Sequence, residues 1–225
     1  YRPFRPHRKT RASVARERGL EPLAALIMEQ KDVYQPSIEE EAARYINEEK
    51  EVLTVEDALQ GASDIIAEDI SDNADFRKEI RAITFENGTI VSKQAKDGDS
   101  PYTMYYDFSE KCRTIPGHRV LAVNRGEKDE FLKVTLEIAE ELPLDYLFGQ
   151  VITNQKSPAY KYVSAATVDS YERLIAPSIE REIRAQLFDD ASEGAIKVFS
   201  SNLKQLLLQP PVKGKVALGL DPGFR

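Results

Sequence analysis

The chain has 225 residues, of which 41% are hydrophobic and 31% are charged, and its formal net charge is −7. This composition can bury a core and excludes an intrinsically disordered chain, while the lack of any apolar run near ~20 residues excludes a membrane helix. The negative net charge argues against a protein that coats nucleic acid over its whole surface.

The single cysteine, Cys112, rules out an intramolecular disulfide and fits a reducing cytoplasm, where we expect the protein to act. The chain starts at Tyr1 without an initiator methionine and without an apolar stretch typical of a secretion signal. We therefore expect a piece of a longer protein, cut at both ends. No phosphate-binding or dinucleotide-binding glycine pattern is present, and we expect no cofactor.

Charge is unevenly distributed along the chain. Residues 1–18, the basic head, carry seven basic side chains and one acidic one, whereas residues 36–72, the acidic body, carry twelve carboxylates and two basic side chains. Any contact with a polyanion should therefore concentrate at the head. The alternative is a solvated arm, or one that pairs with the chain's own acidic surface.

Helix-start signals recur through the first part of the chain. Thr10 is a plausible N-cap for a helix that ends at Gly19, and a second helix is expected over residues 21–30. Residues 37–40 form a capping box, with a hydroxyl at the cap and a carboxylate three residues later. This box predicts a helix through about Glu49.

Two longer helices are expected next. Thr54 and Asp57 repeat the capping pattern ahead of a segment whose apolar residues share one face up to Ile70. Asp72 is the expected cap of the following helix, which should end at Asn87 before a glycine.

The middle of the chain gives weaker signals. Residues 89–92 are compatible with a short strand or with the end of the helical part, and residues 95–101 have turn chemistry throughout. Residues 102–107 are ambiguous and we favour a helix there, as we do for 118–124. Strict alternation of apolar and polar residues over 131–138 predicts a half-buried strand.

The last part of the chain is expected to be helical again. Pro143 begins one helix, Ser157 followed by proline begins another, and the longest should run from Ser178 to the prolines at 210–211, with a possible bend at Gly194. That helix would have roughly 30 residues and a length of about 45 Å. These patterns predict a mainly α fold with a minor β element and a long connecting helix.

Residues 215–225 break this pattern, because they predict a strand that runs into a glycine turn with Asp221 at its end. In RNase H-like folds a carboxylate at the end of the first strand helps to bind divalent metal ions. One carboxylate cannot support two-metal chemistry, so the simplest interpretation of Asp221 is a turn aspartate. We predict no metal site in this chain alone.

Nucleophiles and soft metal ligands are few. His7, His118 and Cys112 lack the close spacing of a zinc site, and a nucleophilic Cys112–His118 pair would have no supporting residue in the sequence around it. Adjacent glutamates are best interpreted as solvated helix faces. We therefore predict no catalytic residue in this chain.

The basic head is the best candidate site. Its aromatic residues Tyr1 and Phe4 could stack on bases while its cations contact phosphates, although Pro3 and Pro6 also suit an arm extended across another domain. The residues expected to bind nucleic acid are Arg2, Arg5, Arg8, Lys9 and Arg11.

Three stretches, in this order, resemble signatures of the Tex family of bacterial transcription accessory proteins. Residues 1–24 run through tyrosine, proline, a basic cluster, Thr-Arg-Ala, Gly-Leu and Leu-Ala; residues 118–127 read His-Arg-Val-Leu-Ala-Val-Asn-Arg-Gly-Glu; and residues 211–225 resemble the entry into the family's RNase H-like domain. The basic cluster departs from the family pattern, since His7 interrupts a run that is often Lys-Arg-Arg.

The resemblance implies a helical N-terminal region, a helix-turn-helix-like insert, an RNase H-like domain, helix-hairpin-helix elements and a C-terminal OB-fold domain on which RNA or DNA binding mainly rests. Residues 1–49 would then hold the basic arm and the first helices, and 50–100 the small helix-turn-helix-like insert, whose acidic front half argues against major-groove reading. Residues 101–210 would be the helical central region, and 211–225 the first strand of a truncated RNase H-like domain.

The sequence thus favours a non-catalytic helical scaffold within a nucleic-acid-binding transcription accessory protein. One alternative is the N-terminal part of a metal-dependent RNase H-like nuclease, with Asp221 as one ligand. Another is a protein-docking platform that offers the acidic body to the transcription machinery. The expected partner of the whole protein is RNA or DNA, bound weakly by this chain, and no membrane contact is expected.

Overall fold

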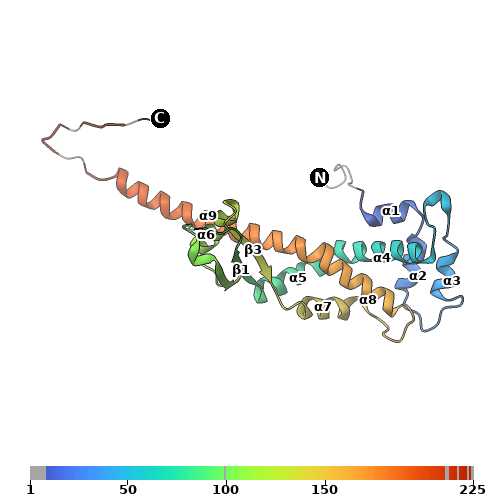
Figure 1. Ribbon diagram of the computed structural model, residues 1–225. Helices are drawn as coiled ribbons and strands as arrows, with labels where there is room; N and C mark the ends of the chain where they lie inside the picture. The colour runs from blue at the N-terminus through green and yellow to red at the C-terminus, as the bar shows by residue number, and fades with distance from the viewer. Residues whose placement is uncertain (1–8, 99, 211–212, 217, 222, 224–225) are drawn as a thin grey trace.

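The computed structural model describes residues 9–98, 100–210, 213–216, 218–221 and 223. The molecule is elongated: helices gather at one end, a small sheet lies further along, and the last helix extends beyond both (Figure 1). The expected mainly α fold with a minor β element is confirmed. Within the described residues, no helix combines the length and the apolar composition that crossing a membrane would require.

The N-terminal helices are set by their caps. They are α1 (Arg11–Glu17), α2 (Glu21–Met28), α3 (Ile38–Ala43) and α4 (Val55–Asp72). Thr10, Ser37 and Thr54 each accept the backbone N–H of the residue three positions later, whose side chain accepts the cap's own N–H. These three capping boxes lie where the sequence predicted helix starts.

Two predicted boundaries in this region are wrong. Helix α3 ends at Ala43 rather than near Glu49, because the Asn47 side chain caps a separate 3₁₀ turn over Glu48–Lys50. Helix α5 (Ala74–Asn87) is capped by Asn73, whose Oδ1 accepts the N–H groups of the second and third helical residues. The expected cap, Asp72, is instead the last residue of α4.

Helix α4 forms the centre of the helical end. Ala62, Ile65 and Ile66 on its apolar face are at most 1% exposed, and the helix contacts α1, α2, α3 and α8. Residues 50–100, for which we predicted a helix-turn-helix-like insert, contain the last residue of the 3₁₀ turn, α4, α5 and the strand β1 (Thr89–Gln94). The division of the chain into four domains stays a prediction.

A three-stranded antiparallel sheet follows, with the order β2-β1-β3. The strand predicted over 131–138 is confirmed as β3 (Leu132–Glu137), and of the two alternatives for 89–92 the structure shows the strand, β1. The helix predicted over 102–107 is wrong: Thr103–Tyr105 forms a 3₁₀ turn, and β2 (Asp107–Lys111) pairs with β1. Pairing with a distant strand overrides the ambiguous local pattern here.

Helix α6 (Gly117–Lys128), which covers the predicted 118–124 helix, packs between β3 and the last helix. Its first residue allows a close approach, because a Cβ on Gly117 would lie 3.2 Å from both Cα and Cβ of Ala191. Helix α7 (Glu141–Val151) returns the chain toward the helical end, where it contacts α5 and α8.

The longest helix is longer than predicted. Helix α8 (Tyr160–Asp169), a π-helical segment (Ser170–Ile175) and α9 (Ala176–Leu207) follow one another without interruption. Their combined length is about 70 Å at 1.5 Å per residue. The two predicted helices, with starts near Ser157 and at Ser178, are therefore one rod, and α9 continues through Gly194.

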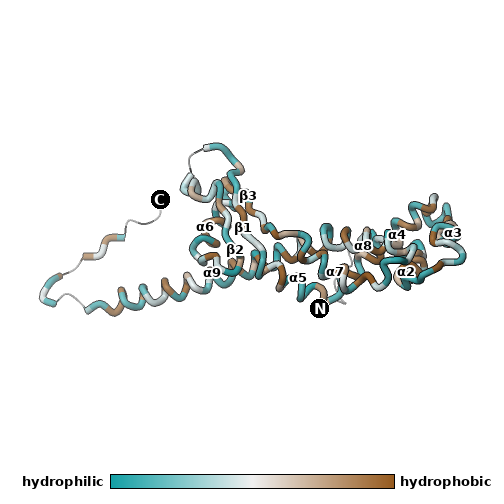
Figure 2. Tube along the Cα trace, turned by 90° about the horizontal axis from the view of Figure 1, so that it is seen from below, coloured by the Kyte–Doolittle hydropathy of each residue, from teal (hydrophilic) through white to brown (hydrophobic). Residues whose placement is uncertain are grey.

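Beyond its contact with α6, the end of α9 makes few contacts within the described residues. Apolar residues recur along this part of the tube (Figure 2), among them Ile196 and Phe199, which are 66% and 67% exposed. This end of α9 therefore leaves its apolar residues exposed among the polar ones.

A carboxylate on α3 provides a pH-dependent link to the long helix. Glu39 Oε1 accepts hydrogen bonds from Lys161 Nζ (2.8 Å) and the Tyr162 hydroxyl (2.6 Å), and these partners lower the pKa of Glu39 to about 2.

A lowered native pKa means that the stabilisation is complete above about pH 4.5 and is lost as the pH falls toward 2. We expect Glu39→Gln to lower the free energy of unfolding by less than about 1 kcal/mol at pH 7, since the pair is half exposed. Thermal unfolding of both proteins across pH 2–7 should show the difference vanish near pH 2. An exposed control, Glu172→Gln, should show no such convergence.

The contact between α6 and α9 can be tested by paired glycine substitutions. Gly117→Ala should destabilise the protein by about 1 kcal/mol through crowding against Ala191. Gly194→Ala, whose new Cβ would meet nothing within 4 Å, should stabilise it by up to about 1 kcal/mol. Urea unfolding measures both. Equal stabilities of the two variants would contradict the close approach.

Candidate nucleic-acid interface

Helix α1 positions the described part of the basic head. Of the five residues expected to bind nucleic acid, Arg2, Arg5 and Arg8 lie outside the described residues. Lys9 and Arg11 flank the Thr10 cap and are exposed; Lys9 Nζ is 3.5 Å from Oε2 of Glu17, at the end of α1. An exposed pair of this kind is worth little, so Lys9 stays available to another anion.

The base of the head is bound to the acidic body. Arg16 contacts Glu68 at 2.5 Å and Asp69 at 2.6 Å, and Arg18 contacts Glu51 at 2.9 Å. The internal pairing that was the alternative interpretation of the head therefore exists for Arg16 and Arg18. Of the five residues proposed to contact phosphates, the two that the structure describes, Lys9 and Arg11, form no ion pair with the acidic body.

Much of the acidic body is used within the chain. Asp64 lies 3.4 Å from Arg173 of the π segment, and burial is the main reason that its pKa is raised. Further carboxylates serve in capping boxes or ion pairs; they are Glu39, Glu40, Glu41, Glu51, Asp57, Glu68 and Asp69. Most carboxylates of the acidic body therefore form hydrogen bonds or ion pairs within the chain, and few remain free to bind a partner.

Asp221 is exposed, and its carboxylate accepts the Gly223 N–H at 3.1 Å. This is the local bond of a turn aspartate. The strand predicted from Lys215 is not formed over 213–216 and 218–221, where nothing pairs with the chain. Among the described residues, no group of three potential metal ligands occurs.

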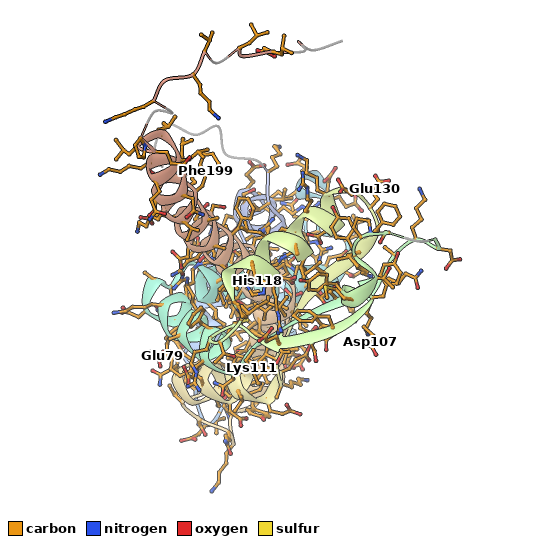
Figure 3. All side chains as sticks on the ribbon, turned by 90° about the vertical axis from the view of Figure 1, so that its left-hand side faces the viewer. Glu79, Asp107, Lys111, His118, Glu130 and Phe199 are labelled. Atoms are coloured by element: carbon orange, nitrogen blue, oxygen red, sulfur yellow. The ribbon has the colours of Figure 1, made fainter. Side chains whose placement is uncertain are left out.

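Cys112 and His118 do not form a reactive pair. The Cys112 thiol is buried against the sheet, and burial raises its pKa to about 11, so it is protonated at neutral pH. His118 is exposed at the start of α6 (Figure 3). The cysteine is thus a small core residue, and His7 lies outside the described residues.

A second group of cations, which the sequence did not indicate, lies on α6 and α9. Arg125 and Lys128 of α6 and Arg181 of α9 are exposed, and none has a carboxylate within ion-pair distance in the part of the chain that the structure describes. Their segments are close to neutral, so charge counting along the sequence could not single them out. Only the packing of α6 on α9 brings them together.

Comparison with known proteins identifies the family. Residues 34–199 match the family model described as Tex central region-like. The chain is 48% identical to the uncharacterized protein YdcI of Bacillus subtilis, with all of this chain and 32% of the relative covered. It is 32% identical to the transcriptional accessory protein Tex of Neisseria gonorrhoeae, with all of this chain and 30% of the relative covered.

A human relative, S1 RNA-binding domain-containing protein 1, is 31% identical over 96% of this chain and 23% of its own length. The chain thus spans about a third of the length of the bacterial relatives. The family match covers most of the helical end, the sheet and most of the long helix. This chain belongs to the Tex family.

Proposed function

We propose that the chain is a helical scaffold within a nucleic-acid-binding transcription accessory protein and that it performs no catalysis of its own. The printed names of two relatives, one a transcriptional accessory protein and one an S1 RNA-binding domain protein, support the general role. The observation that carries the scaffold role is the uninterrupted helix from Tyr160 to Leu207, against which both the helical end and the sheet pack.

Polar contacts support a fixed docking of the sheet on this helix. Glu180 Oε1 accepts the backbone N–H of Leu136 in β3 at 3.1 Å. Arg184 donates to the carbonyl of Val134, in the same strand, at 3.1 Å and also pairs with Glu127 of α6. Two adjacent turns of α9 therefore hold both the strand and the helix of the sheet unit.

The helical end is held by equivalent contacts. Ser170 Oγ, in the π segment, donates to the carbonyl of Ala67 in α4 at 2.7 Å, in a buried position. Arg77 of α5 reaches Ser178 Oγ at 2.7 Å and Glu182 at 2.8 Å. Because directional bonds fix both units to one rod, the chain is suited to set the relative position of whatever is attached to it.

The rival functions have less support. Nuclease activity needs carboxylates beyond Asp221, which is exposed and bonded within its own turn. A docking platform on the acidic body would compete with the internal ion pairs of those carboxylates. A protonated, buried thiol is consistent with action in the reducing cytoplasm.

The scaffold role predicts a fixed distance between the two units. In a Cys112→Ala background, spin labels at Glu56→Cys in α4 and Ser109→Cys in β2, both exposed positions, should give one narrow distance distribution. Glu172→Pro, which breaks the helix in the π segment, should broaden it. A broad distribution without the proline, or Mg²⁺- or Mn²⁺-dependent phosphodiesterase activity of the chain, would contradict the role.

The basic head should bind single-stranded RNA or DNA weakly and without sequence preference. We expect a dissociation constant on the order of tens of micromolar, with a salt slope of about −0.7 per phosphate contact. Replacing Arg2, Arg5, Arg8, Lys9 and Arg11 by alanine should remove this component of binding and leave the thermal midpoint unchanged. Fluorescence anisotropy across a salt series measures it. Unaltered binding with a lower midpoint would show that the head has a structural role instead.

A further inference from the structure

A groove runs between α6 and α9 on the sheet side of the molecule. It consists of two adjoining hollows of about 600 and 340 Å³, which share Asn124 of α6 and Phe188 of α9. Phe188 is 43% exposed although phenylalanine is normally buried. The groove therefore presents an aromatic ring to solvent on a floor made by two packed helices.

The rim of the groove is basic. Arg125 and Lys128 line one hollow and Arg181 lines the other, and all three are exposed without an ion pair among the described residues. Helical spacing explains the arrangement: Arg125 and Lys128 are neighbours on one face of α6, and Arg181 lies two turns, about 10 Å, before Phe188 on one face of α9.

The nearby carboxylates do not cancel this charge. Glu127 pairs with Arg184, a third arginine that lines the groove. Asp129 accepts the hydroxyl of Tyr102 at 2.5 Å and keeps its negative charge, so it offsets one of the three unpaired cations. Asp189 and Asp190 follow Phe188 by one and two residues, so the helix turns them about 100° and 200° away from it. Cations remain in excess at the rim in a chain of net charge −7.

We propose that this groove binds a short segment of single-stranded nucleic acid, with a base stacked on Phe188 and phosphates on Arg125, Lys128 and Arg181. An aromatic platform beside unpaired cations is the combination that single strands require. The proposal rests on the nucleic-acid part of the proposed function and not on the scaffold role. It places a second contact far along the sequence from the basic head.

The absence of tryptophan from the chain allows a direct test. Phe188→Trp introduces the sole tryptophan, whose fluorescence should be quenched when unlabelled 12-nucleotide oligouridylate or oligothymidylate is added at low salt. The matched control is Phe199→Trp. Phe199 is 67% exposed and lies on the end of α9 that extends past α6 (Figure 3). The fluorescence of this variant should show no saturable quenching. The five alanine substitutions in the head should leave the Phe188→Trp quenching in place, because no described residue of the head lines the groove.

Affinity measurements on fluorescein-labelled oligouridylate complete the test. Phe188→Ala should weaken binding between about fivefold and about a hundredfold, as expected for loss of one stacked base. Arg125→Gln with Lys128→Gln should flatten the salt slope by about 1.4. The control pair Lys78→Gln and Lys156→Gln, exposed cations remote from the groove, should change neither quantity.

Several results would overturn the proposal. They are unchanged emission of the Phe188→Trp protein at saturating oligonucleotide, an affinity of Phe188→Ala equal to that of the parent, or equal salt slopes for the groove pair and the control pair. Unchanged emission would leave the groove as a surface for a protein contact. Circular dichroism of each variant must match the parent, and the fixed distance between labelled units would remain a separate test of the scaffold role.

Discussion

Both packed units of the molecule depend on one side of one helix. Ile175, Ile179 and Ile183 recur every four residues and are at most 1% exposed, and they lie where the helical end and the sheet unit meet the rod. Burying each isoleucine contributes about 1.5–3 kcal/mol, which is large beside the net stability of an ordinary domain. If this stripe were polar, the sheet unit and α5 would lose their apolar contact with the rod, and the helical end would be left with its packing on α8.

The π-helical segment allows a proline in this rod. Pro177 stands in the first turn of α9, where its ring would clash with the preceding turn of a regular helix and its missing N–H would leave a carbonyl unpaired. The wider turn over Ser170–Ile175 accommodates it without ending the helix. The same segment carries Ser170 and Arg173, whose bonds to α4 stabilise the irregular geometry.

Local signals predicted the helix starts at Thr10, Ser37 and Thr54, because a capping box is complete within four residues. Features that depend on distant contacts were not predictable in the same way. The stretch 102–107 forms a turn and the start of a strand because β1 pairs with it. Pro177 predicts a helix end, and the continuity of α8 with α9 depends on the π segment and on packing that the local sequence does not show.

The same distinction between local signals and distant contacts applies to the candidate sites. The basic head was evident from charge counting, and the pairing of its last arginines with the acidic body was foreseen as an alternative. The groove was not foreseen, because Lys128 and Arg181 lie on separate helices and more than fifty residues apart along the chain, each in an unremarkable segment. The apolar repeat of the long helix passes through Ile183 and Leu187 and does not single out the exposed Phe188.

Because one end of α9 is exposed, the free energy of local opening differs along this continuous helix. Amide protons near the π segment are sheltered by α4 and the sheet, whereas those beyond Ala191 are held by helical hydrogen bonds alone. Backbone groups that lack tertiary cover open locally at much smaller free energies than those in a core. Hydrogen exchange along this single helix should therefore run from slow to fast toward Leu207, so that the rod is rigid at its centre and frays at its tip.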